Sequence, residues 1–109
     1  MGDCTISVEA NIRFLTTEQG GRQTALSGNG SYRPNHNFSN PDDPVMCIGF
    51  IELDEGERVA PGDSLHKTIT FLASSEIAAE IREGREWRIQ EGGKLVAIGT
   101  VLKVLEGCE

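Results

Sequence analysis

The residues best suited to chemistry are two arginines in segments where the backbone is constrained. Arg22 follows Gly20 and Gly21, and Arg33 stands directly before Pro34. A guanidinium group is a planar fork that can hold a phosphate or a carboxylate through two hydrogen bonds. Glycine most often serves backbone geometry, so Gly20 and Gly21 predict a shaped loop. Because the chain has 17 acidic residues, an internal salt bridge is at least as good a use for each arginine as an external anion.

Catalytic and metal-binding patterns find little support. His36 and His66 each lack a partner at metal-ligand or catalytic-triad spacing. The acidic clusters Asp42-Asp43 and Asp54-Glu55-Gly56-Glu57 lack the ligand order of an EF-hand and are interpreted as solvated turns. A Gly-x-x-x-x-Gly-Lys-Ser/Thr phosphate loop is also missing. The sequence therefore predicts a binding domain without catalytic residues, metal, cofactor or nucleotide site.

The charge balance bears on the kind of partner. The chain has 10 Lys and Arg residues against 17 Asp and Glu, a formal net charge of -7. Nucleic-acid binding depends largely on neutralising phosphates with Lys and Arg. The composition therefore favours a protein partner over RNA.

Cysteine usage indicates the compartment. Cys4, Cys47 and Cys108 are too few and too scattered for a secreted disulfide framework, and no apolar run approaches membrane-spanning length. A cytoplasmic protein without a membrane segment is expected. Cys4 and Cys108 flank the first and last predicted strands, so they are expected to lie close together, either as a disulfide or as two free thiols.

The elements that must position these residues are mostly strands. Ile6, Val8, Ala10, Ile12 and Phe14 alternate with polar residues, which is typical of a strand with one buried face. Further strands are predicted over 35–38, 45–53, 65–72, 86–90 and 94–105. The segment 45–53 is apolar enough for a largely buried strand, and Lys67 interrupts the apolar face of the strand that contains it.

The intervening segments carry turn signals. Residues 16–31 contain four glycines and predict a long loop, while Pro61-Gly62 fits the central positions of a type II turn. Residues 74–82 have helical propensity but are few, and they predict either a short helix or a loop with one turn of helix. Trp87 is expected in the core or at a rim. With 109 residues, the chain is expected to form one all-β domain over residues 1–109, a small antiparallel barrel or sandwich.

Five segments in the same order resemble the C-terminal domain of bacterial elongation factor Tu and related translational GTPases. They cover nearly the whole chain and are Glu18-Gln-Gly-Gly-Arg-Gln-Thr24, Tyr32-Arg-Pro34, Ile51-Glu-Leu53 with Glu55-Gly56, Pro61-Gly-Asp63, and Glu83-Gly84 through Trp87-Arg-Ile-Gln-Glu-Gly-Gly93 to Val104-Leu105. The resemblance implies a six-stranded antiparallel β-barrel.

The resemblance also implies binding positions. In the family, the arginine that corresponds to Arg22 and a following histidine lie against the T-stem backbone of aminoacyl-tRNA, but Gln23 replaces that histidine here. Asn35 stands where the family has a glutamine, and Gly92 keeps the first glycine of the Glu-Gly-Gly turn. A family lysine falls on Ile77, which reduces the cationic contacts.

Two functions of different class follow from these observations. The first is a protein-interaction module linked to translation, whose partners would be a GTPase domain, an exchange factor or a toxin. The alternative is a tRNA-binding module that keeps part of the family surface through Arg22, Gln23, Asn35 and Gly92. The acidity favours the first.

Overall fold

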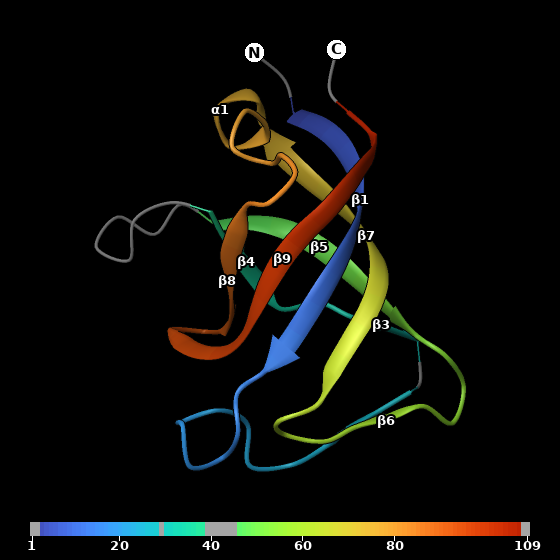
Figure 1. Ribbon diagram of the computed structural model, residues 1–109, viewed down its shortest axis with the longest axis vertical. Helices are drawn as coiled ribbons and strands as arrows, with labels where there is room; N and C mark the ends of the chain where they lie inside the picture. The colour runs from blue at the N-terminus through green and yellow to red at the C-terminus, as the bar shows by residue number, and fades with distance from the viewer. Residues whose placement is uncertain (1–2, 29, 39–45, 108–109) are drawn as a thin grey trace.

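The computed structural model describes residues 3–28, 30–38 and 46–107. Strands make up most of these ranges, with one short helix (Figure 1). The elements in chain order are β1 (Asp3–Phe14), β2 (Leu26–Ser27), β3 (Gly30–Tyr32), β4 (Asn35–Asn37), β5 (Met46–Leu53), β6 (Arg58–Val59), β7 (Ser64–Ser74), α1 (Ser75–Ala78), β8 (Glu86–Glu91) and β9 (Lys94–Glu106).

The main sheet closes on itself. Strand order runs β5-β4-β8-β9-β1-β7, and β7 pairs again with β5. Strands β3 and β4 lie along the same edge of β5 in one register, since Tyr32 pairs with Ile51 and Asn35 with Ile48. Pro34 falls in the break between them and has no N–H to donate. With β3 and β4 counted as one interrupted strand, the fold is a closed six-stranded antiparallel barrel, which confirms the predicted fold class.

The alternation along β1 builds the centre of the core. Ile6, Val8, Ala10, Ile12 and Phe14 are each between 0 and 2% exposed, as predicted. Their register with β7 sets Ile6 opposite Phe71 and Val8 opposite Ile69, two residues that are also fully buried. Burying a large aliphatic or aromatic side chain stabilises a fold by about 1.5–3 kcal/mol, so this pair of strands is a principal source of stability.

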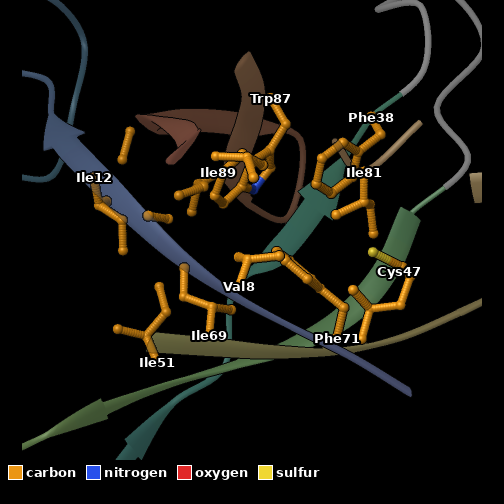
Figure 2. Close-up of a cluster of buried hydrophobic side chains, with 14 of the residues drawn as sticks. Val8, Ile12, Phe38, Cys47, Ile51, Ile69, Phe71, Ile81, Trp87 and Ile89 are labelled. Atoms are coloured by element: carbon orange, nitrogen blue, oxygen red, sulfur yellow. The ribbon is translucent and has the colours of Figure 1, made fainter. Parts of the chain in front are cut away.

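A group of aromatic rings packs together in the core. Phe38 stacks on Trp87 with ring centroids 5.1 Å apart, and Phe71 meets both rings edge-on. Figure 2 shows Trp87 and Phe38 close together within the same buried cluster as Phe71. Trp87 is 2% exposed, so it belongs to the core. A Cβ on Gly99 would lie 2.5 Å from the indole ring, which explains why β9 has a glycine there.

Short elements depart from the sequence expectation. The predicted loop over 16–31 contains β2, which pairs with β6, and the first two residues of β3, which pairs with β5. Strands of two or three residues are too short for an alternating pattern, so the sequence does not reveal them. Helix α1 has four residues, Ser75–Ala78, so residues 74–82 contain a single helical turn, which is one of the two predicted alternatives. The Ser74 side chain caps it by accepting a hydrogen bond from the Ile77 N–H at 3.2 Å.

Two further predictions concern the turn at Pro61-Gly62 and the out-of-pattern Lys67. Gly62 has a φ of +91°, and the Asp63 N–H donates to the Ala60 carbonyl at 3.0 Å, which confirms the turn at Pro61-Gly62. Lys67, out of pattern on its strand, is half-buried and donates to Glu57 at 2.7 Å.

Some expectations fall on other parts of the chain. Cys108 and the Asp42-Asp43 cluster lie outside the described residues. Within the described ranges, no helix has the length and apolar character needed to cross a membrane.

Candidate functional site

Arg22, the first predicted anion-binding residue, is held by neighbours from its own protein. Its guanidinium forms an ion pair with Glu91. Its Nε donates to the Thr24 carbonyl at 3.1 Å, and its Nη2 donates to Thr24 Oγ1 at 3.3 Å. The side chain is only 20% exposed. The internal salt bridge anticipated for Arg22 is therefore what the structure contains.

Glu91 joins three segments of the barrel at one carboxylate. The oxygen that accepts from Arg22 also accepts from the Tyr32 hydroxyl, so the loop after β1, the strand β3 and the end of β8 meet here. Burial, followed by the hydrogen bond to Glu91, raises the pKa of Tyr32 above its usual value. The hydroxyl therefore remains a protonated donor at neutral pH, and the cluster of Arg22, Tyr32 and Glu91 fixes the loop to the barrel.

The glycine pair before Arg22 serves backbone geometry. Gly20 has a φ of +93°, a conformation that favours glycine. A Cβ on Gly21 would lie 2.6 Å from the Leu15 carbonyl oxygen, so the loop backbone packs too closely for any side chain. The Thr17 hydroxyl closes the loop by donating to the Arg22 carbonyl at 2.8 Å.

The hairpin between β8 and β9 gathers three of the four predicted binding residues. Arg22 contacts Glu91, Asn35 pairs with Gln90, and Gly92 forms the turn with a φ of +63°. Asn35 and Gly92 are exposed. Gln23, next to Arg22 in the chain, is exposed as well. The structure thus brings Arg22, Asn35 and Gly92 to one region, but the guanidinium of Arg22 is already engaged there.

His36 is a core residue. The Trp87 indole Nε1 donates to His36 Nδ1 at 3.0 Å, and burial lowers the pKa of His36 to about 4. Its Nε2 has no well-formed hydrogen bond among the described residues, although the nearby backbone of Gly49 raises the pKa against the larger effect of burial. The ring is therefore neutral at pH 7 and inaccessible to a ligand.

His66 lies at the surface instead. Its Nε2 is 3.1 Å from Glu9 Oε1, and more than half of its side chain is exposed. In the described ranges, no three His, Cys, Asp or Glu side chains come together as a metal site.

A surface feature that the sequence interpretation missed is a pair of exposed apolar residues. Ile48 on β5 is 54% exposed, and its cross-strand partner Leu72 on β7 is 41% exposed. The prediction of a largely buried strand over 45–53 is therefore wrong for one of its faces: Cys47, Gly49 and Ile51 are buried, whereas Ile48 is exposed. Residues 45–51 are uninterruptedly apolar or glycine, so no alternation distinguishes the two faces.

No model of a known protein family matches the chain. One exposed apolar feature of the described residues is the pair on β5 and β7, which lies next to Arg33, in the break between β3 and β4, and Asn35 on β4. Groups of these kinds are suited to contacts through apolar burial and hydrogen bonds.

Proposed function

We propose that the chain is a non-catalytic protein-interaction module linked to translation, resembling the C-terminal barrel of elongation factor Tu and acting in the cytoplasm. The observation that carries the proposal is the exposed pair of Ile48 and Leu72 on the outer wall of a closed barrel. Large aliphatic side chains gain stability when they leave water. Two of them side by side favour a protein surface as the partner.

The internal contacts of Arg22 favour a protein partner over RNA. By resemblance, Arg22 would lie against a tRNA backbone, but its guanidinium is satisfied by Glu91 and Thr24. Breaking that ion pair to reach a phosphate would leave the Glu91 carboxylate facing the same phosphate. The net charge of -7 adds long-range repulsion against any polyanion.

The alternative function, tRNA binding, has one observation in its favour. Arg33, in the break between β3 and β4, and Asn35, on β4, are both exposed. The guanidinium of Arg33 lies over the Phe50 ring, 5.2 Å from its centroid, and Arg33 takes part in no ion pair within the described ranges. An RNA-binding surface would start from these two residues.

A capture experiment from cell lysate distinguishes the two functions. The immobilised chain is incubated with lysate that has or has not been treated with nuclease, and bound protein and RNA are identified by mass spectrometry and sequencing. Specific proteins that remain bound after nuclease treatment are the expected result. Loss of every captured component on nuclease treatment would instead establish the RNA-binding alternative.

A further inference from the structure

The exposed apolar pair belongs to a row that crosses four strands of the barrel. Asn35 on β4 pairs with Ile48 on β5, Ile48 pairs with Leu72 on β7, and Leu72 pairs with Thr5 on β1. Asn35, Ile48, Leu72 and Thr5 are all exposed. Cross-strand neighbours on one face lie about 4.5–5.5 Å apart at Cβ. The row is therefore continuous, with apolar residues at its centre and polar residues at both ends.

A second row lies beside the first, two residues along each strand. Phe50 on β5 is half-buried and pairs with Thr70 on β7, whose hydroxyl is 3.1 Å from that of Ser7 on β1. On the other side of Phe50, Arg33 covers the ring with its guanidinium. Phe50 thus extends the apolar centre, and Arg33 provides a cation at its border. We call Arg33, Asn35, Ile48, Phe50 and Leu72 the β5–β7 face.

The charge on Arg33 is available for a partner. Within the described ranges Arg22 pairs with Glu91, Lys67 with Glu57 and Arg85 with Glu80. Arg33 has only the contact with the Phe50 ring there. That contact holds the planar group in place at the edge of the apolar centre. An arginine oriented in this way can receive a carboxylate through two parallel hydrogen bonds.

A third row lies two residues further along the strands and contains carboxylates, which limit where an acidic group can bind. Glu52 on β5 accepts from the Ser31 hydroxyl at 2.5 Å, and Glu9 on β1 lies beside His66. These carboxylates repel an acidic group on their side of the face. A carboxylate brought by a partner is therefore directed to Arg33, which fixes the orientation of the segment that carries it.

We propose that the β5–β7 face binds a protein segment that presents an apolar side chain next to an Asp or Glu. The apolar side chain covers Ile48 and Leu72, and the carboxylate pairs with Arg33. This inference rests on the proposed protein-interaction function and names the chemistry of the partner. An RNA strand fits the face less well, because Ile48 and Leu72 offer neither a cation nor a hydrogen bond to phosphate.

A displayed library of random peptides tests the proposal without knowledge of the natural partner. The library is selected on the intact chain, and enriched peptides are synthesised and measured by calorimetry. Enrichment of an apolar residue within a few positions of Asp or Glu is expected. Ile48→Thr and Leu72→Thr should each weaken the selected peptide about tenfold or more. Arg33→Gln, which keeps most of the side chain over Phe50, should weaken it about three- to tenfold and reduce its salt dependence.

Matched variants on other parts of the barrel serve as controls. Leu102→Thr removes an apolar side chain of 45% exposure from β9, and Arg13→Gln removes an exposed cation from β1. Neither should change the affinity of the peptide. All variants are first compared with the original chain by circular dichroism and thermal unfolding, and only those with an unchanged spectrum are used.

Three outcomes would overturn the inference. In the first, no peptide is enriched, and in the second, basic peptides are enriched. In the third, Leu102→Thr lowers the affinity of the selected peptide as much as Ile48→Thr does. Repeating the lysate capture with Ile48→Thr separates this inference from the proposed function. If proteins remain bound to the variant after nuclease treatment, the proposed function is supported, but the β5–β7 face is not their binding site. Capture of RNA alone would contradict both the binding role of the β5–β7 face and the protein-interaction function.

Discussion

The Trp87 indole donates a hydrogen bond to His36 Nδ1, 3.0 Å away inside the barrel core. It connects the neighbouring strands β4 and β8, where His36 pairs with Ile89. Because Nδ1 accepts this hydrogen bond, the proton of the neutral ring resides on Nε2. A second proton would have to enter a buried site whose walls are the rings of Phe71 and Trp87. The neutral form is thus part of the folded state.

The protein should lose stability on mild acidification because of His36. Its pKa is about 4 in the folded state against an ordinary value of 6.5, so between these values the unfolded chain binds a proton that the folded chain does not. The free energy of unfolding should therefore fall as pH is lowered from 6.5 to 4, by about 3 kcal/mol in all. Urea unfolding at a series of pH values measures this slope.

Two variants isolate the contribution of His36 to that slope. His36→Gln should flatten the dependence between pH 6.5 and 4, whereas His66→Gln, at an exposed position, should leave it in place. The pKa of Glu57 is lowered mainly by the hydrogen bond from Lys67, so its contribution is lost below its ordinary pKa, largely outside this window. An unchanged slope in His36→Gln would show that another group causes the acid sensitivity.

Gly99 is required by the indole that packs against it. A methyl group there would lie 2.5 Å from Trp87, so Gly99→Ala must displace the ring or the strand. We expect a loss of about 1–3 kcal/mol in the free energy of unfolding, together with a change in Trp87 fluorescence. Gly107→Ala is the matched control, because a methyl group at that position meets no atom of the described residues within 4 Å. Equal effects of the two substitutions would contradict the packing explanation.

The strands that the sequence predicted best are those with one solvent-facing and one buried face. Along β1 the alternation of apolar and polar residues is complete, and the five apolar positions are buried. Along β5 both faces are apolar, so the sequence could not show that Ile48 is exposed. Only the closed order of the strands makes one of these faces the outer wall.

Long-range pairs explain why the candidate site was only partly predicted. Arg22 and Glu91 are 69 positions apart, and neither residue carries a local signal for the other. The resemblance to the elongation-factor domain predicted Arg22, Asn35 and Gly92 as binding residues, and the structure brings these three near one hairpin. It could not indicate that Glu91 neutralises Arg22, since that depends on where β3, β8 and the loop after β1 meet.

The thiol of Cys47 should be unreactive while the protein is folded. It is a free cysteine with 6% exposure, and burial raises its pKa to about 12. The thiolate is the nucleophilic form, so little of it exists at pH 8. Iodoacetamide should modify Cys47 at least ten times more slowly in the native protein than in urea, as read from the peptide that contains residue 47. Equal rates would show that β5 opens readily.

Arg22→Ala should act on the stability of the loop rather than on RNA. Removing the guanidinium leaves the partly buried Glu91 carboxylate with Tyr32 as its side-chain partner among the described residues, at a cost of about 1–2 kcal/mol in the free energy of unfolding. Amide hydrogen exchange over residues 16–24 should become faster in the variant, because the loop loses its attachment to β8. Arg13→Ala, at an exposed residue outside the described ion pairs, should change neither quantity.

The same pair of variants tests the affinity for tRNA. Since Arg22 is engaged by Glu91 and the net charge is -7, binding of aminoacylated tRNA at physiological salt should be no tighter than about micromolar. Arg22→Ala and Arg13→Ala should then give the same weak binding in a filter or mobility-shift assay. A complex that depends on aminoacylation, resists added salt and is lost in Arg22→Ala alone would mean that Arg22 leaves Glu91 to bind the RNA backbone. In that event the tRNA-binding function would replace the protein-interaction function.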